Sequence, residues 1–178
     1  MKVMLKERIE SAIRDVPDFP KPGIIFKDIT PIMKDPTLSK DIVEGLREKY
    51  ANQNIDAVAG IESRGFLFGY PLAMALNVPF VLIRKKGKLP YDKISFAYDL
   101  EYGSAEVEMH TDAVVKGQRV LIHDDLLATG GSANAAAELI KQRGAEVAGF
   151  DFLVSLEFLN GKDKLSKHSN AIEALVKY

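Results

Sequence analysis

Two adjacent carboxylates followed by a glycine pair form the segment of this sequence with the clearest capacity for chemistry. The run VLIHDDLLATGGSANAAAELI (120–140) indicates an apolar strand that ends in Asp124 and Asp125, a short turn and an alanine-rich helix. A glycine pair lets backbone N–H groups turn toward a ligand, and the positive end of the following helix is worth about 0.3–2 kcal/mol to an anion. The hydroxyls of Thr129 and Ser132 can donate further hydrogen bonds. The turn therefore predicts a phosphate site.

The two acids narrow the kind of phosphate that this turn would bind. Asp124 and Asp125 would repel a bare phosphate ion, so the ligand should offer them hydroxyl groups or a metal ion. A ribose 5-phosphate meets both requirements. The competing interpretation is a strand that ends in two acids before an ordinary turn, with Ser132 as the helix N-cap. The succession of strand, acids, turn and helix favours the phosphate site, because doubly wound sheets bind ligands at the carboxyl ends of their strands.

The rest of the chain supplies the elements that must position this turn. Short apolar strands alternate with helices, which indicates an α/β fold with a doubly wound, mostly parallel sheet flanked by helices. The expected strands are 56–61, 79–84, 119–123 and 146–156, and the expected helices are 3–14, 38–50, 64–76 and 132–143. Residues 93–109 break this rhythm with two alternating segments and predict an antiparallel hairpin that projects from the sheet. Residues 171–176 could form a late strand.

The stretch from Asp15 to Pro36 contains five prolines. Because proline disfavours both helix interiors and central strands, we expect an ordered loop there, as part of a small N-terminal hood. A chain of 178 residues is expected to form a single domain. Its expected parts are the hood (1–36), an α/β core (37–156) with the hairpin at about 90–110, and a tail (157–178).

Composition excludes several classes of protein. Lys and Arg number 24 against 25 Asp and Glu, so no overall field favours nucleic acid. The absence of cysteine excludes disulfides and thiolate sites, and the three histidines have no zinc-ligand spacing. His123 is expected to be a packed strand residue. No stretch approaches the roughly 18 apolar residues of a membrane span. We therefore expect a cytoplasmic protein without a membrane or nucleic-acid partner.

Several motifs give the chain a resemblance to a known family. HDDLLATGGS resembles the donor-binding signature of the type I phosphoribosyltransferases, and its Leu-Leu-Ala-Thr-Gly-Gly form resembles in particular the members that act on adenine. The segments PDFPKPGIIFKDITPIMKDP, AGIESRGFLFG, VLIRKKGKLP and LEYGSAEVEM are similar to further family segments in the family order. Ser132 stands where the family usually has threonine, and His123 where it usually has an aliphatic residue.

The resemblance implies a reaction and its participants. The family transfers 5-phosphoribose from 5-phosphoribosyl 1-pyrophosphate to N9 of adenine, which gives AMP and pyrophosphate in purine salvage. Mg²⁺ accompanies the donor, and the members are homodimers. No side chain is assigned directly to the metal ion, which could reach Asp124 or Asp125 through water. The alternatives are a 6-oxopurine or xanthine phosphoribosyltransferase and a non-catalytic regulator with the same fold.

The resemblance also implies site residues. Ribose 5-phosphate would contact Asp124, Asp125, Ala128, Thr129, Gly130, Gly131 and Ser132. Pyrophosphate would contact Ser63, Arg64, Arg84, Lys85 and Lys88, with a cis peptide bond between Glu62 and Ser63. Adenine would stack on Phe26 and hydrogen-bond to backbone groups of Ile25 and Lys27. Glu101, in a mobile lid, would be the catalytic acid/base at the purine imidazole ring.

Other interpretations of these residues remain open on sequence alone. Ser63 could cap a helix beside a solvated Arg64, and Phe26 could belong to the core. The basic run 84–88 could be an ordinary charged surface, in which Lys86 has no assigned role. The basic run and Glu101 together favour an enzyme, because a regulator needs neither.

Overall fold

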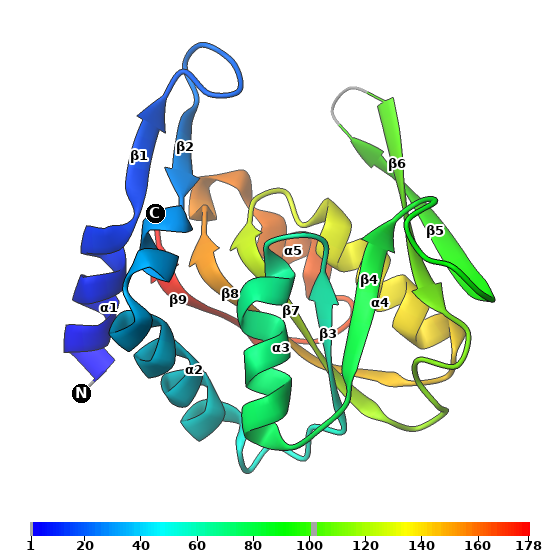
Figure 1. Cartoon of the computed structure of the whole chain (residues 1–178). Coiled ribbons are helices and arrows are strands. Elements are labelled where there is room, and N and C mark those ends of the chain that lie inside the picture. The colour runs from blue at the N-terminus through cyan, green and yellow to red at the C-terminus, as the bar shows by residue number, and fades with distance from the viewer. Residues whose placement is uncertain (1, 101–102) are drawn as a thin grey trace.

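The computed structural model describes residues 2–100 and 103–178, and a seven-stranded mixed sheet forms its centre (Figure 1). Its strands lie in the order β5 (Lys93–Leu100), β6 (Gly103–His110), β4 (Phe80–Lys85), β3 (Ala57–Ile61), β7 (Arg119–Leu127), β8 (Glu146–Ser155) and β9 (Ile172–Lys177). The five strands from β4 to β9 in this order are parallel, whereas β5 and β6 run antiparallel to their neighbours. The predicted α/β class and the predicted late strand are confirmed.

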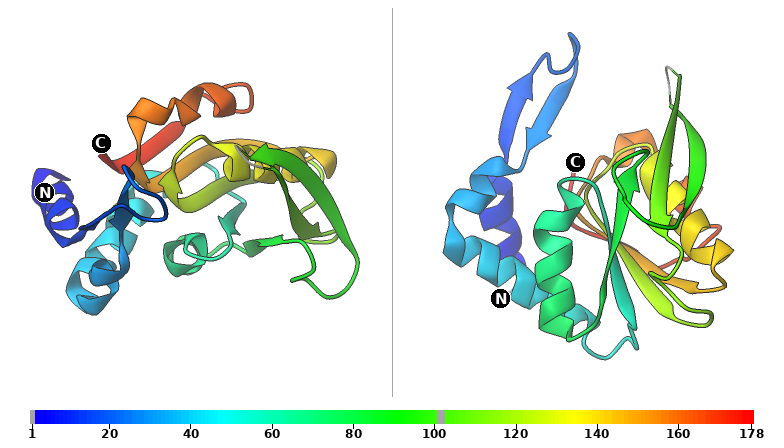
Figure 2. Two further views of the ribbon diagram at one scale, coloured as in Figure 1. Left: turned by 90° about the horizontal axis from the view of Figure 1, so that it is seen from above. Right: turned by 45° about the vertical axis from the view of Figure 1, so that its right-hand side comes forward.

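Helices cover both faces of the sheet (Figure 2). The helices α1 (Lys2–Ala12), α2 (Pro36–Tyr50) and α3 (Gly65–Leu76) lie on one side, and α4 (Gly131–Gln142) lies on the other. A short helix, α5 (Gly161–Leu165), packs against α4. All five residues of β3 are buried, as expected for a strand covered on both faces. Among the helices of the described chain, none is long and apolar enough to cross a bilayer.

The proline-rich stretch differs from the expected loop. It contains the strands β1 (Arg14–Pro17) and β2 (Ile25–Asp28), which pair as an antiparallel ribbon, and a 3-10 helix, η1 (Thr30–Lys34). Proline is compatible with a ribbon of this kind, because each strand has one edge that pairs with no neighbour in the sheet. The ribbon rises from the helical layer at the upper left of Figure 1.

The projecting hairpin was predicted correctly. β5 and β6 pair from Lys93↔His110 to Leu100↔Gly103, and β6 joins the main sheet through two residues of β4. The far end of the hairpin extends beyond the sheet at the same edge as the β1–β2 ribbon (Figure 1). Two antiparallel projections therefore flank the carboxyl ends of the parallel strands.

Two predicted boundaries near the acids are wrong. β7 does not end at His123 but continues to Leu127, because β8 pairs with it as far as Leu127↔Ser155. Asp124 and Asp125 therefore lie inside a strand. The N-cap of α4 is Gly130, with φ of +76°, so Ser132 lies in the first helical turn and is not the cap.

Candidate active site

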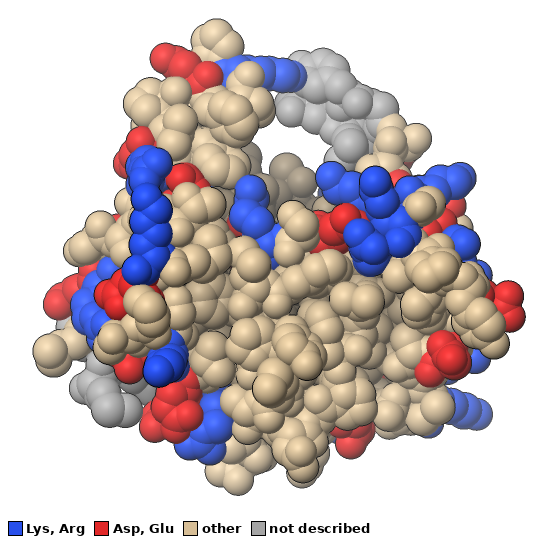
Figure 3. Space-filling view, in the orientation of Figure 1, with Lys and Arg blue, Asp and Glu red and all other residues tan. Residues whose placement is uncertain are grey.

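Three loops meet at the carboxyl edge of the central strands. The first follows β3 at residues 62–64, the second follows β4 at 86–88 and the third follows β7 at 128–130. Since β3 pairs in parallel with both β4 and β7, these loops leave the sheet side by side. Lys and Arg side chains gather at the upper right of Figure 3, below the grey residues. The edge thus brings together the predicted ribose 5-phosphate and pyrophosphate segments.

The turn after β7 leaves its backbone donors available. Gly130 adopts the left-handed conformation that favours glycine. Within residues 2–100 and 103–178, no group accepts a hydrogen bond from the backbone N–H of residues 129–133, and the first such bond of α4 runs from Asn134 to the Gly130 carbonyl at 2.9 Å. An anion placed at this turn would therefore meet several unused donors and the positive end of a helix.

Two elements that sequence reasoning missed support this turn. A Cβ on Gly161, at the start of α5, would lie 2.2 Å from the Ala128 carbonyl oxygen, so the two backbones touch. On the other side, the Tyr98 hydroxyl of β5 lies 2.9 Å from Ser132 Oγ. A Cβ on Gly131 would also come within 3.2 Å of the Tyr98 ring. The hairpin and α5 therefore hold the turn between them.

The two acids have different environments. The Asp125 carboxylate is buried and accepts a hydrogen bond from Arg64 Nε at 2.5 Å. Asp124 Oδ1 accepts the backbone N–H of Asp125 at 2.9 Å. Burial, and then the neighbouring Asp125 carboxylate, raise the pKa of Asp124 well above its ordinary value. Gly65 leaves room for this arrangement, because a Cβ there would lie 2.9 Å from Asp124 Oδ1. Among the described residues, Asp124 forms no ion pair, whereas Asp125 is paired with Arg64, so the Asp124 carboxyl is suited to bind hydroxyl groups.

Glu62 organises the basic loop after β4. Its carboxylate accepts hydrogen bonds from Arg84 at 3.0 and 3.3 Å and from the Lys85 backbone N–H at 3.0 Å. The Arg84 hydrogen bond is the main cause of the lowered pKa of Glu62. Arg84 Nη1 also donates to the Lys88 carbonyl at 2.8 Å. The Lys85 and Lys88 side chains are exposed at this edge, which is where a polyanion would meet them.

The peptide bond between Glu62 and Ser63 is cis, as the resemblance implied. The N-cap of α3 is Arg64, and the Ser63 side chain forms no capping hydrogen bond with it, so the interpretation of Ser63 as a helix cap is wrong. Ser63 is exposed just before the start of α3. Lys86 forms an ion pair with Glu106 at 2.6 Å, which agrees with its lack of an assigned role.

Arg64 connects the acids to the β1–β2 ribbon. Its guanidinium carbon lies 5.3 Å from the centroid of the Phe26 ring, within the range of a cation–π contact. Phe26 is half-buried and also packs edge-on against Phe19. Ile25 is 56% exposed, and the Lys27 side chain turns to other partners, Asp15 and Tyr178. Phe26 therefore lies beside Arg64, the partner of Asp125, rather than within either hydrophobic core.

Glu101, the predicted acid/base, lies outside the described residues. The strand positions nearest to it, Leu100 and Gly103, pair with each other in the hairpin that flanks the site. The remaining predicted site residues form two groups, one at the carboxyl edge of the main sheet and one on the β1–β2 ribbon. The ribose and pyrophosphate residues lie at or just after the carboxyl ends of β3, β4 and β7, and the adenine residues Ile25, Phe26 and Lys27 lie on β2.

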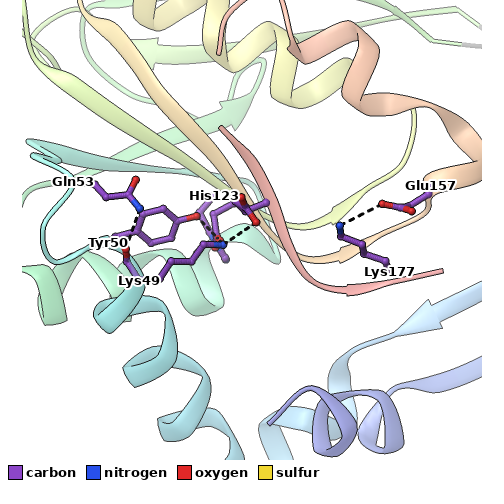
Figure 4. Close-up of polar contacts among 8 residues, drawn as sticks. Lys49, Tyr50, Gln53, His123, Glu157 and Lys177 are labelled. Atoms are coloured by element: carbon purple, nitrogen blue, oxygen red, sulfur yellow. Dashed lines mark hydrogen bonds and ion pairs between the residues drawn. The ribbon is translucent and has the colours of Figure 1, made fainter. Parts of the chain in front are cut away.

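His123 is a packed strand residue, as predicted. Its Nδ1 lies 2.8 Å from the Asp151 carboxylate, which also accepts the Tyr50 hydroxyl at 2.8 Å (Figure 4). Burial and then the Asp151 carboxylate raise the pKa of Tyr50. His123 Nε2 is buried without a hydrogen-bond partner among the described residues. This network joins α2, β7 and β8 beneath the site.

The fold and this edge define a phosphoribosyl-transferring domain. The family model described as the phosphoribosyl transferase domain matches residues 28–172, and the chain belongs to that family. The predicted resemblance is thereby confirmed.

Individual relatives narrow the comparison. The adenine phosphoribosyltransferase of Cytophaga hutchinsonii is 52% identical over 175 residues, which cover 98% of this chain and 97% of the relative. A crystal structure of the adenine phosphoribosyltransferase of Thermoanaerobacter pseudethanolicus superimposes with a TM-score of 0.93 at 48% identity, covering 97% of this chain and 99% of the other. The Saccharomyces cerevisiae enzyme, solved with an imino-altritol bisphosphate and adenine, has a TM-score of 0.90 at 40% identity and covers 97% and 99%.

Proposed function

We propose that this chain is an adenine phosphoribosyltransferase, which transfers 5-phosphoribose from 5-phosphoribosyl 1-pyrophosphate to N9 of adenine. The products are AMP and pyrophosphate, and the biological role is purine salvage. The observation that carries the proposal is the turn at 128–132, whose unused backbone donors lie next to a carboxylate suited to hydroxyl groups. The adenine phosphoribosyltransferases among its relatives support adenine as the acceptor.

The donor is expected to bind across the carboxyl edge. Its 5-phosphate would accept hydrogen bonds from the N–H groups of residues 129–132, and its ribose hydroxyls would donate to Asp124 and Asp125. The pyrophosphate group would lie toward the loops after β3 and β4. The proposed residues there are Ser63, Arg64, Arg84, Lys85 and Lys88. This orientation follows from the positions of the loops after β4 and β7, which lie on either side of β3. A single donor molecule must reach the turn after β7 with its 5-phosphate and the loop after β4 with its pyrophosphate.

The chemistry requires charge stabilisation at both ends of the breaking bond. The bond from ribose C1 to the pyrophosphate oxygen breaks with an oxocarbenium-like transition state, so negative charge develops on the leaving group. Lys85 and Lys88 would stabilise that charge, and Asp124 and Asp125 would lie on the ribose side. Lewis-acid stabilisation of the pyrophosphate oxygens is what Mg²⁺ would supply when bound with the donor.

The donor set fits a metal ion that arrives with its substrate. In the described part of the chain, no group of three or more acidic or histidine side chains forms a metal site. Mg²⁺ usually keeps several waters and binds through one or two carboxylates together with substrate phosphates. Asp124 or Asp125 would therefore contact the ion through water.

The base is proposed to bind along the free edge of β2. Backbone groups of Ile25 and Lys27 would read adenine, which places an N6 donor beside an N1 acceptor, whereas 6-oxopurines reverse that pattern. Phe26 would stack on the purine. Glu101 would exchange a proton with the imidazole ring, at N7, while N9 attacks the ribose carbon.

We also propose a homodimer in the cytoplasm. Leu67, Tyr70 and Met74 of α3 are 43–64% exposed and lie at a spacing that puts them on one helical face. A two-fold interface presents the same patch on both copies, and an uncharged apolar patch is compatible with itself. The cytoplasmic location follows from the substrate, because a charged phosphate ester does not cross a lipid bilayer unaided.

The test is an assay of pyrophosphate released from the donor with adenine, hypoxanthine, guanine or xanthine, each with and without Mg²⁺. We expect release with adenine that depends on Mg²⁺. Preference for hypoxanthine, guanine or xanthine would support the alternative enzyme. Donor binding without release, measured by calorimetry, would support the non-catalytic regulator.

A residue-level test separates binding from chemistry. We expect Asp124→Ala combined with Asp125→Ala to abolish donor binding, because both ribose contacts are removed. Glu101→Ala should slow turnover and leave donor affinity nearly unchanged. Calorimetry with the donor and steady-state kinetics give the two readouts. Equal loss of donor affinity in both variants would contradict the assigned roles.

A further inference from the structure

We infer that Tyr178 is a positioning residue for the base-binding strand β2, through a contact between its ring and the ammonium group of Lys27. The inference rests on the proposed function, because β2 carries the residues assigned to adenine. Lys27 Nζ lies 3.9 Å from the centroid of the Tyr178 ring. It also lies 2.6 Å from Asp15 Oδ1, on the neighbouring strand β1. One ammonium group thus links both strands of the ribbon to the residue that follows β9.

The ribbon needs such an anchor because it is a separate two-stranded sheet. It joins no strand of the main sheet and projects away from it in two views (Figures 1 and 2). An isolated two-stranded ribbon is marginally stable in water and depends on contacts with other elements. Its orientation therefore depends on side chains that reach the main body of the protein.

Phe26 and Lys27 supply those contacts from the two faces of β2. Successive residues of a strand point in opposite directions, so Phe26 faces Arg64 in the site while Lys27 faces Tyr178. The Lys27 side chain is only 14% exposed. The contact to Tyr178 thus fixes the ribbon from behind, on the side away from the base.

Tyr178 is itself held firmly. Its N–H donates to the Ser155 carbonyl at 2.9 Å, and its carbonyl accepts the Glu157 N–H at 2.8 Å. Glu157 is fixed in turn by ion pairs with Lys162 at 2.8 Å and Lys177 at 3.7 Å, the second of which is drawn in Figure 4. A ring on this anchored backbone can set the position of Lys27 on the projecting ribbon, whereas an unanchored ring could not.

The contact predicts a selective kinetic effect. Tyr178→Ala should raise the KM for adenine roughly 3- to 10-fold, as expected for loss of a partly desolvated cation–π contact. The KM for the phosphoribosyl donor should stay within about 2-fold, because the donor-binding loops do not contact the ribbon through Tyr178. Tyr178→Phe keeps the ring and should behave as the wild type. Phe158→Ala, which removes an aromatic side chain that is 70% exposed, is the matched control.

A mutant cycle assigns the effect to the contact itself. Lys27→Met should also raise the KM for adenine, and combining it with Tyr178→Ala should add little further. The inference is overturned if Tyr178→Ala leaves the KM for adenine unchanged, raises both KM values equally, or is matched by Tyr178→Phe. If the wild-type chain does not convert adenine at all, the proposed function fails and this inference fails with it. If the wild-type chain converts adenine and Tyr178→Ala has the same KM for adenine, this inference alone is overturned.

Discussion

Asp124, which is proposed to bind the ribose hydroxyls, carries a cost in stability. Its carboxyl group is enclosed beside the Asp125 carboxylate, and both burial and that neighbour raise its pKa. A group whose pKa is higher in the folded than in the unfolded state stabilises the fold most below its ordinary pKa. That contribution is lost as the pH rises through the raised pKa. The Asp124 carboxyl therefore contributes less to the free energy of unfolding at neutral pH than at acidic pH.

We predict that Asp124→Asn raises the thermal midpoint at pH 8 and weakens donor binding by at least about 100-fold. Asparagine keeps an oxygen for the Asp125 N–H but carries no charge, and it loses strong hydrogen bonds to the ribose hydroxyls. The gain in midpoint should shrink as the pH falls toward 4. Thermal unfolding at several pH values and calorimetry with the donor measure the two effects.

Asp125→Asn is the matched control for this prediction. Asp125 is paired with Arg64, so its replacement removes an ion pair and should not stabilise the fold. A lower midpoint for Asp124→Asn than for the wild type at pH 8 would contradict the prediction.

At the scale of elements, the sequence pattern predicts the alternation of strands and helices well. Runs such as 57–61 and 120–122 are apolar because both of their faces are covered, and that property is visible in composition alone. The first and last residues of strands and helices are harder to predict from the sequence. β7 extends through Asp124 and Asp125 because β8 pairs with it, and pairing between distant strands leaves no local pattern.

The same reason explains which parts of the site were missed. The glycine turn and the acids are contiguous, so their spacing could be interpreted. Tyr98 and Gly161 reach the turn from segments about 30 residues to either side, and neither residue type is unusual where it stands. The β1–β2 ribbon was not predicted because its prolines argue against a central strand, although they are compatible with short edge strands.

We predict that Gly161→Ala weakens donor binding by about 10-fold or more and leaves the KM for adenine nearly unchanged. The new methyl group would collide with the Ala128 carbonyl oxygen, so the turn must shift away from its donor-binding position. Steady-state kinetics with each substrate varied in turn measure the effect. Lys164→Ala, an exposed change in the same helix, should leave both constants unaltered. A variant at position 161 with a normal KM for the donor would show that α5 does not support the turn.

At the scale of the whole molecule, one face of α3 exposes the apolar side chains of Leu67, Tyr70 and Met74. Charged side chains are sparse across the lower centre of Figure 3, the part of the view in which α3 lies in Figure 1. Exposed apolar residues that form a contiguous patch mark interaction sites more often than isolated ones do. A second copy of the chain is the occupant that we propose.

We predict that Leu67→Glu combined with Met74→Glu converts the dimer to a monomer. Each new carboxylate would face its counterpart or an apolar surface across the two-fold interface, where an unpaired charge is costly. Light scattering coupled to gel filtration measures the mass. Met4→Glu, at an exposed apolar residue of α1, is the control and should remain dimeric. A wild-type chain that is monomeric at micromolar concentration would contradict the proposal directly.

The buried contact between His123 and Asp151 constrains how the sequence can diverge. Replacing His123 by an aliphatic residue would leave the buried Asp151 carboxylate with the Tyr50 hydroxyl as its nearest remaining partner. Replacing Asp151 first would instead leave the imidazole with both nitrogens unsatisfied. Each single step is therefore unfavourable, although both changes together could restore an apolar strand. In homologues, we therefore expect the residues at positions 123 and 151 to change together, so the residue at one position predicts the residue at the other.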